Sequence, residues 1–216
     1  MELMITDKKF LITASALAAI LAWTACSNAP KPTTETKTVA EAKKEPPRPP
    51  EPVAAQTAFY EMYKPARAWA ADLMPLSLAS NETAIMKNEG GKAAIWTAVF
   101  VSPQRREART FFYSAVDDGE SIRRGVTAGG AQPWSGPTPQ SRPFQTADFM
   151  INSDAAYQAA LAKAGAWVKA HPDKKPTFFL GSSAKFPQPV WFVIWGTTKS
   201  GYAVYVNATT GVASLK

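Results

Sequence analysis

Two stretches of the chain carry hydrophobic residues at the three- and four-residue spacing of an amphipathic helix. The first runs from about Thr57 to Trp69 and is rich in aromatic residues, and Pro65 is expected to kink or interrupt it. The second begins at Ser153, a favourable N-cap, and stops before Pro172. The pattern therefore predicts one helix in each half of the chain.

Shorter apolar blocks follow each helix and predict β-strands. They span residues 73–80, 93–101, 109–116 and, more weakly, 121–126 after the first helix, and residues 177–181, 190–196 and 202–208 after the second. In the last block Val204 and Val206 alternate with Ala203 and Tyr205, so one strand face is expected to meet the helix and the other solvent or a partner. Gly211 then supplies the positive φ of a turn.

The element order predicts an α+β fold built from two helix-plus-antiparallel-sheet units. The units are expected at residues 56–128 and 151–216, the second being the better patterned. Residues 129–150 are rich in glycine and proline at their start and are expected to form a connecting loop.

The two units also share aromatic positions. Trp69 matches Trp167 at a separation of 98 residues, Trp96 matches Trp195 at 99, and Tyr113 falls where Tyr205 does. Near-equal separations favour a duplicated unit, although aromatic-rich strands also align by chance. In such a unit an exposed aromatic sheet face would bind a protein or pack against the other unit, and the pattern leaves both open.

The N-terminus has the layout of an export signal. Lys8 and Lys9 precede an apolar run from Phe10 to Trp23, which is shorter than a membrane-spanning helix needs to be. The small residues before Cys26 resemble the bacterial lipobox, apart from Trp23, where an aliphatic residue is usual. This resemblance implies that residues 1–25 are a lipoprotein signal peptide and that Cys26 carries lipid such as palmitate. It also implies a cell-envelope location, with the outer membrane favoured in an organism that has two membranes.

Residues 26–55 have many prolines, mixed charge and no aromatic residue. Such a composition buries too little apolar surface to fold, so a disordered, Pro-rich tether is expected between the membrane anchor and the folded part.

Charge and composition limit the chemistry further. The net charge is +7; residues 1–25 are neutral and residues 26–55 carry five basic and four acidic side chains, which leaves +6 for residues 56–216. One cysteine and one histidine make no internal disulfide and no Cys/His metal site, so neither a metal nor a cofactor is expected.

A basic patch on neighbouring strands is one interpretation of the charge excess, and ordinary solubilising charge is the other. The residues of this patch are Arg105, Arg106, Arg109, Arg123 and Arg124. Its partner outside the cytoplasm would be an envelope protein or an anionic surface ligand, with nucleic acid disfavoured. Trp134 is a second candidate contact residue, or a tryptophan that pins its loop to the body.

The run YAVYVNATTGVASL at residues 202–215, after a helix and the strand VWFVIW, resembles the last hairpin of a PepSY domain. Asn207 stands where that family usually has aspartate. PepSY domains are regarded as extracytoplasmic inhibitory or binding modules without catalysis, so the resemblance implies a non-enzymatic binding role for residues 151–216.

A rival function is an envelope serine hydrolase. Ser182 and Lys185 form an S-x-x-K motif, and Lys199 begins a K-S-G sequence, but the hydrolase mechanism needs its serine at the start of a helix and the motif here follows a strand. A structural envelope lipoprotein without a specific ligand is the third alternative. The expectation is a lipid-anchored, non-enzymatic binding or inhibitory module.

Overall fold

A computed structural model describes residues 49–117, 122–197 and 200–215. The expected signal peptide, Cys26 and the expected tether up to residue 48 lie outside the described residues. Within those residues, no helix has the length and apolar character needed to cross a membrane. Pairing begins at Val53, inside the segment expected to be a tether, because Val53 and Ala54 form a short strand.

The described chain contains two long helices, one short 3-10 helix and ten strands. In chain order they are β1 (Val53–Ala54), α1 (Ala55–Trp69), β2 (Met74–Asn81), β3 (Lys92–Ala93), β4 (Ile95–Ser102), β5 (Glu107–Ser114), β6 (Gly125–Pro133), η1 (Thr146–Asp148), α2 (Ser153–Ala170), β7 (Pro176–Gly181), β8 (Val190–Trp195), β9 (Tyr202–Asn207) and β10 (Ala213–Leu215).

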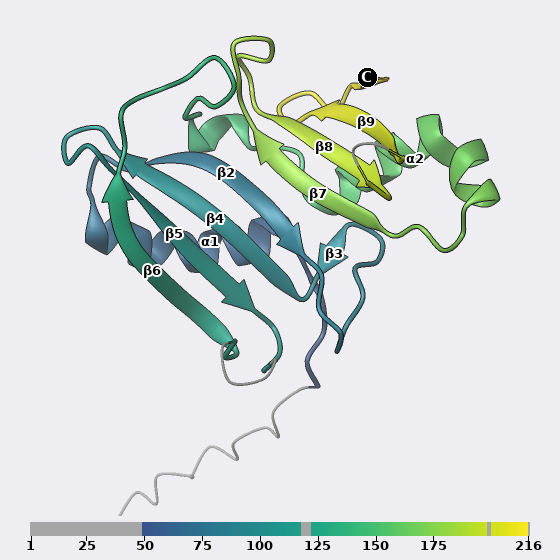
Figure 1. The fold of residues 1–216 in the computed structure, drawn as a ribbon, viewed down its shortest axis with the longest axis horizontal. Coiled ribbons are helices and arrows are strands. Elements are labelled where there is room, and N and C mark those ends of the chain that lie inside the picture. The colour runs from purple at the N-terminus through teal and green to yellow at the C-terminus, as the bar shows by residue number, and fades with distance from the viewer. Residues whose placement is uncertain (1–48, 118–121, 198–199, 216) are drawn as a thin grey trace, which may run out of the picture. The chain divides into compact units, whose positions relative to one another are not determined.

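Eight strands form one antiparallel sheet in the order β10-β9-β8-β7-β2-β4-β5-β6, and β1 pairs with β3 in a separate small sheet (Figure 1). Each half supplies a helix followed by four strands of the large sheet, and the first strands of the two halves, β2 and β7, pair at its centre. The α+β class with two helix-plus-sheet units is confirmed. The two units share a single sheet and a single core rather than forming two separate bodies.

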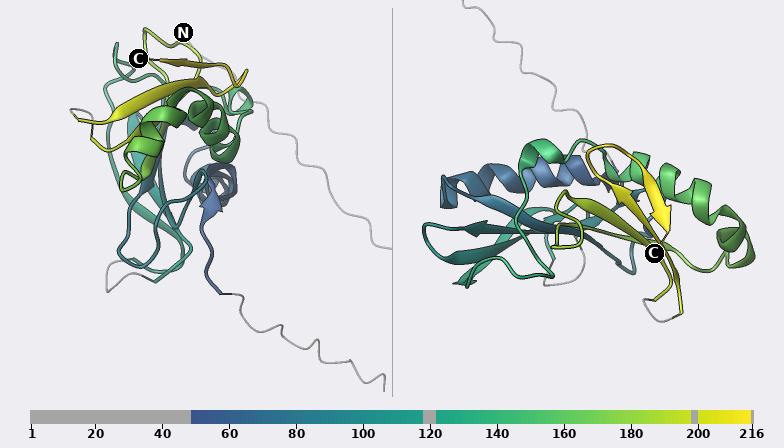
Figure 2. Two further views of the ribbon diagram at one scale, coloured as in Figure 1. Left: turned by 90° about the vertical axis from the view of Figure 1, so that its right-hand side faces the viewer. Right: turned by 90° about the horizontal axis from the view of Figure 1, so that it is seen from above.

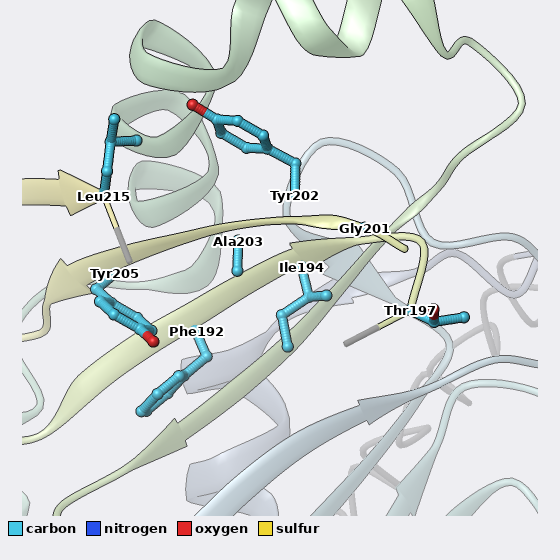
Figure 3. Close-up of a pocket in the computed structure, with 8 residues that line it drawn as sticks. All are labelled: Phe192, Ile194, Thr197, Gly201, Tyr202, Ala203, Tyr205 and Leu215. Atoms are coloured by element: carbon cyan, nitrogen blue, oxygen red, sulfur yellow. The ribbon is translucent and has the colours of Figure 1, made fainter. Parts of the chain in front are cut away.

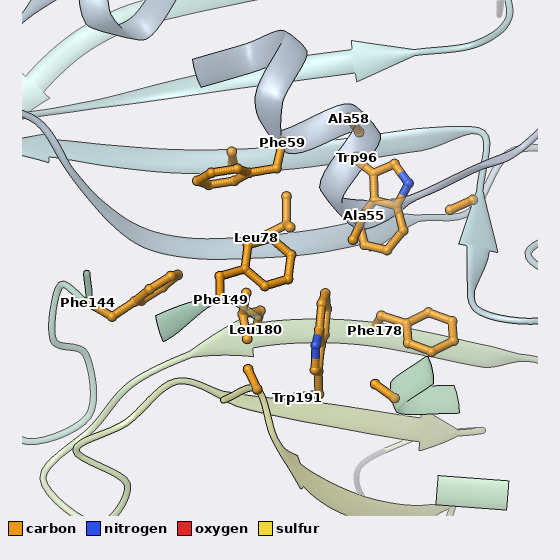
Figure 4. Packing of buried hydrophobic residues seen from close by; sticks show 14 of the residues in the cluster. Ala55, Ala58, Phe59, Leu78, Trp96, Phe144, Phe149, Phe178, Leu180 and Trp191 are labelled. Atoms are coloured by element: carbon orange, nitrogen blue, oxygen red, sulfur yellow. The ribbon is translucent and has the colours of Figure 1, made fainter. Parts of the chain in front are cut away.

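Both helices lie on the same face of the large sheet, as the view from above shows (Figure 2). Between helices and sheet lies a core of aromatic residues and alanines (Figure 4). The alanines Ala58, Ala156 and Ala160 are fully buried and allow the helix backbones to approach the large rings of the sheet. The opposite face of the sheet carries no helix in the described part of the chain (Figure 2).

The N-termini of the two helices meet, and the second half caps the first. Ala54 offers no side-chain cap to α1. Instead Ser153 Oγ accepts the Ala55 N–H at 2.8 Å, and Asn152 Oδ1 accepts the Gln56 N–H at 2.9 Å. Ser153 was expected to cap its own helix, but Asn152 takes that position and frees the serine for the neighbouring helix.

Strand register corrects one of the expected repeat positions. Ile95 begins β4 opposite the end of β2, and Val190 begins β8 opposite the end of β7. Trp96 therefore corresponds to Trp191, not to Trp195. Each of these indoles donates its N–H to the carbonyl two residues before its own helix, at Val53 and Ile151.

The same register makes Phe112, rather than Tyr113, the counterpart of Tyr205, since Phe112 faces Thr97 and Tyr205 faces Phe192. Matching identical residue types between the halves gave the wrong alignment for β4 with β8 and for β5 with β9, because strands tolerate different residue types at equivalent positions. The helix match is consistent with the structure: Trp69 and Trp167 both lie near helix ends and pack against the core.

Two further expectations differ from the structure. Helix α1 continues through Pro65 to Trp69, because the proline is on the exposed side while Met62 and Ala66 anchor the helix to the core. The expected loop at residues 129–150 starts inside a strand, since β6 runs from Gly125 to Pro133. Its sequence, GVTAGGAQP, lacks an apolar pattern because β6 is an exposed edge strand held by backbone pairing with β5.

Candidate functional site: the open face of the sheet

One row of directly opposed residues crosses the whole open face of the sheet. Each member is the cross-strand neighbour of the next, so all side chains of the row point to the same face. From β6 to β10 the row is Thr127, Phe112, Thr97, Ala79, Phe179, Phe192, Tyr205 and Ser214. The central pair, Ala79 and Phe179, is where the two halves meet.

The row is aromatic in both halves and remains accessible to solvent. Phe112 and Phe179 each expose 41% of their surface. The residues before them in the chain, Phe111 and Phe178, expose only 1% because they point into the core. Strand pairing does not require the rings of Phe112 and Phe179 to be exposed, so the open face carries apolar surface that the hydrophobic core does not bury.

In the second half the rings of the open face form one cluster, in which Phe179 is exposed and Phe186, Phe192 and Tyr205 are half-buried. The ring of Phe192 lies 5.7 Å from Phe179 and 5.0 Å from Tyr205, and Phe186 from the β7–β8 connection packs on both Phe192 and Tyr205. Lys185 Nζ lies 5.2 Å from the Phe186 ring centre and 5.9 Å from that of Tyr205, within cation–π range. The cluster therefore presents a cation beside apolar rings.

A shallow groove of about 460 Å³ lies over β8 and β9 in this half (Figure 3). Phe192, Ile194 and Tyr205 line it from the open face, whereas the ring of Tyr202 points toward the helix side. A second groove of about 340 Å³ lies over β4, β5 and β6, and Phe112, Ile95 and Arg123 are among the residues that line it. The two halves thus place a groove on equivalent strands of the same face.

The alternation predicted for the last long strand is confirmed. Val204 and Val206 are fully buried against the helix side, and Tyr205 lies on the other face. The sequence left open whether this face would pack against the other unit. Because the units join side by side through β2 and β7, both faces stay open on the same side of the sheet.

The predicted arginines are divided between the two ends of the β5–β6 hairpin. Arg105 and Arg106 form the turn before β5, whereas Arg123 and Arg124 lie beside its far end, where the Arg124 N–H bonds Asp117. The eight residues of β5 separate the two pairs by roughly 25 Å at the rise of an extended strand. The five residues therefore do not form one patch.

Arg109 takes a structural position between these ends. Its Nε donates to the Gly129 carbonyl at 2.8 Å, and its guanidinium lies 5.5 Å from the centre of the Phe111 ring. Trp134 is joined to the arginine turn, because its N–H bonds the Arg106 carbonyl and both residues line a shallow groove of about 420 Å³. This bond comes from the backbone of Trp134, so both interpretations of its side chain stay predictions.

The serine motif has a geometry unlike that of serine–lysine hydrolases. Ser182 and Ser183 follow β7 in a turn in which the Ser183 N–H donates to the Phe186 carbonyl and the Phe186 N–H donates to Ser183 Oγ, so neither serine begins a helix. The Ser182 side chain is buried and its Oγ has no hydrogen-bond partner among the described residues. Lys185 instead lies over aromatic rings, and Lys199 is outside the described residues.

The sequence did not single out Phe112, Phe179 or Phe192 as surface residues. A usable signal existed in the paired aromatics, because two adjacent phenylalanines in a strand must point to opposite faces. Phe111 with Phe112, and Phe178 with Phe179, each place one ring inside and one outside. Which of the two lies inside depends on register, which the sequence does not supply.

No family model and no curated protein matches this chain. A crystal structure from Clostridium difficile 630, described as that of a "putative lipoprotein", is similar to it at 9% sequence identity with a TM-score of 0.43. The match covers 73% of this chain and 90% of the other. The PepSY resemblance of residues 151–216 stays a prediction.

Proposed function

We propose that this protein is a non-enzymatic binding or inhibitory module of the bacterial cell envelope that recognises a protein through the open face of its sheet. The observation that carries the proposal is the aromatic row on that face, with Phe112 and Phe179 exposed in equivalent halves. Aromatic side chains, phenylalanine and tyrosine among them, are enriched in protein–protein interfaces.

The shape of the face favours a protein over a small molecule. Small-molecule sites are concave and bury most of their ligand, whereas the grooves here are shallow and lie apart, one over β8 and β9 and the other over β4, β5 and β6. A broad partner surface would cover the Phe179 and Phe192 rings together with Phe112. Burying these rings removes apolar area from water, worth roughly 25 cal/mol per Å² before association costs.

Attachment to the membrane is part of the same proposal and rests on the lipobox resemblance around Cys26. Radiolabelled palmitate should enter the wild-type chain in the native host, and Cys26→Ser should abolish both labelling and removal of the signal. Membrane fractionation would then show which membrane holds the mature protein. The outer membrane is expected, because Ser27 and not an aspartate follows the cysteine. A Cys26→Ser chain that is still processed and membrane-bound contradicts the anchor.

A site-specific photocrosslinker tests the partner. Benzoylphenylalanine is placed at Phe112 or Phe179 in living cells, with Tyr60 as the matched control because it is an aromatic residue exposed by 47% on the helix face. The proposal expects one defined envelope protein to be captured from both sheet positions and not from Tyr60. That protein, once purified, should bind wild-type chain saturably and bind Phe179→Ser at least about tenfold more weakly.

Three results separate the alternatives. A structural lipoprotein without a ligand predicts no saturable partner at either sheet position, which would reject the proposal. Labelling of Ser182 or Ser183 by a fluorophosphonate or a penicillin probe, lost on Ser→Ala replacement, would favour the hydrolase instead. Equal crosslinking from Tyr60 would show that the open face is not the recognition surface.

A further inference from the structure

Strand β6 is the outermost strand of the large sheet on the side of the first half (Figure 1). It is nine residues long, carries no charged residue, and seven of its nine residues are exposed. The other edge, β10, has three residues. An edge strand leaves every second N–H and C=O without a partner strand, and long neutral edges are the kind that accept another strand.

Two features limit how much of β6 is available. The register shifts between Arg109 and Phe111, which places a bulge at Gly129 and Gly130, and Arg109 Nε fixes the Gly129 carbonyl. Pro133 closes the strand and lacks an N–H. The regular segment Gly125–Ala128, paired with Ser114 to Phe111, is therefore the part that can receive a further strand.

Positive charge lies at both ends of this neutral edge. Arg123 and Arg124 precede β6, and Arg105 and Arg106 lie in the turn beside its end, where Arg106 bonds Trp134. Within the described part of the chain none of these four arginines makes an ion pair with a carboxylate. The nearby described acids are Asp117, which accepts the Arg124 N–H, and Glu107, which lies opposite Pro133. Glu82 lines the same groove as Arg123, and the charge of Arg105 acts on the carboxylate of Asp72.

The adjoining groove adds a third element of recognition. It is lined by Thr127 and Ala128 of β6 together with Ile95, Phe112 and Arg123. A strand added to β6 would direct alternate side chains to the open face, next to Thr127. One apolar side chain of such a strand would reach this groove.

Resting on the proposed function, we propose that the partner contributes an extended acidic segment that adds to β6 as a ninth strand. Main-chain hydrogen bonds to Gly125–Ala128 provide the pairing, and carboxylates at the ends of the segment meet the two arginine pairs. The groove selects an apolar side chain in between. This is β-strand addition, with specificity carried by charge and by alternate side chains.

The probe is a fluorescein-labelled synthetic peptide, DDTVTVTVDD, titrated into the full chain in detergent. Saturable binding is expected, weaker by about tenfold or more when asparagine replaces every aspartate, and weaker as salt rises. A peptide N-methylated at alternate residues keeps its side chains but loses backbone donors, so its binding should be abolished. Hydrogen exchange should slow at Gly125–Ala128 and not at β10.

Charge variants provide the matched protein control. Arg123→Gln with Arg124→Gln should weaken the peptide several-fold, whereas Lys163→Gln with Lys169→Gln removes the same charge from the exposed surface of α2 and should leave binding unchanged. No saturable binding at millimolar peptide, or equal binding of the N-methylated peptide, overturns the inference. So does slowed exchange at β10 instead of β6.

The open-face proposal and the strand-addition proposal at β6 can be rejected independently of each other. Phe179→Ser lies outside β6 and should retain peptide binding even where it abolishes partner capture. Peptide binding at β6 with no partner captured at Phe112 or Phe179 would keep the edge site and reject the open-face proposal. A partner captured at the open face that does not slow exchange in Gly125–Ala128 would reject the edge site alone.

Discussion

The indole rings of Trp96 and Trp191 meet edge to face across the junction of the two halves, with ring centres 6.4 Å apart and an interplanar angle of 68°. Each indole N–H donates a hydrogen bond to a backbone carbonyl just before its own helix, that of Val53 (3.0 Å) or Ile151 (2.8 Å). Both rings are fully buried. This pair therefore ties each helix to its sheet and the two halves to each other.

Replacing either tryptophan by phenylalanine should be costly. Trp96→Phe or Trp191→Phe removes one hydrogen bond and leaves unfilled volume, so we expect a loss of about 2 to 3 kcal/mol in the free energy of unfolding. Because the rings touch, the double variant should deviate from additivity by about 0.5 kcal/mol or more. Urea unfolding of the four chains measures this, and strictly additive losses would contradict a direct contact.

The shared helix cap predicts a second destabilising change. Ser153→Ala leaves the buried Ala55 N–H without its acceptor, so a loss of about 1 to 3 kcal/mol is expected on thermal or urea unfolding. Asp154→Ala is the control, because Asp154 is half-buried and its carboxylate accepts the N–H of the following residue, Ala155, in its own helix. A larger loss from Asp154→Ala would show that the cap between the halves contributes little.

Adjacent phenylalanines test which face of the sheet is open. Phe178→Ala and Phe111→Ala remove rings that are 1% exposed and should each cost about 3 to 5 kcal/mol. Phe179→Ala and Phe112→Ala remove rings that are 41% exposed and should cost about 1 kcal/mol or less. Comparable losses within either pair would mean that something covers the open face in the folded chain.

Asp72 gives a pH-dependent prediction. The Gln104 N–H and the Ser102 hydroxyl hydrogen-bond its carboxylate and hold the pKa of Asp72 below its usual range. A carboxylate with a lowered folded-state pKa stabilises the fold above about pH 4, where the unfolded group ionises, and loses that contribution as pH falls through the folded pKa.

Asp72→Asn should therefore lower the urea midpoint at pH 7 and make the midpoint less sensitive to acid than in the wild type. The exposed carboxylate in Glu82→Gln provides the same charge change without these hydrogen bonds. If the urea midpoint of Asp72→Asn falls in acid as steeply as that of the wild type, Asp72 is not the titrating group. Exchange at the β4–β5 turn, residues 103–106, should also rise, since Asp72 holds that turn to the start of β2.

Local pattern was sufficient for most elements. The second helix was expected from Ser153 and is found at Ser153–Ala170, and Gly211 has the positive φ, +76°, expected of its turn. The inward Val204 and Val206 were also predicted. Strand β6 was expected only weakly and at residues 121–126, whereas it runs from Gly125 to Pro133, because an exposed edge strand is specified by pairing with β5 and not by apolar side chains.

The sequence by itself determined the two helices, most strands and their order, since side-chain periodicity within one element is a local property. The tertiary structure decided that β2 pairs with β7, that Trp96 corresponds to Trp191, and that both aromatic faces open on one side. It also divided the five arginines between two ends of a hairpin. The physical reason is that strand neighbours and register depend on backbone hydrogen bonds between distant segments, and backbone groups are alike at nearly every residue.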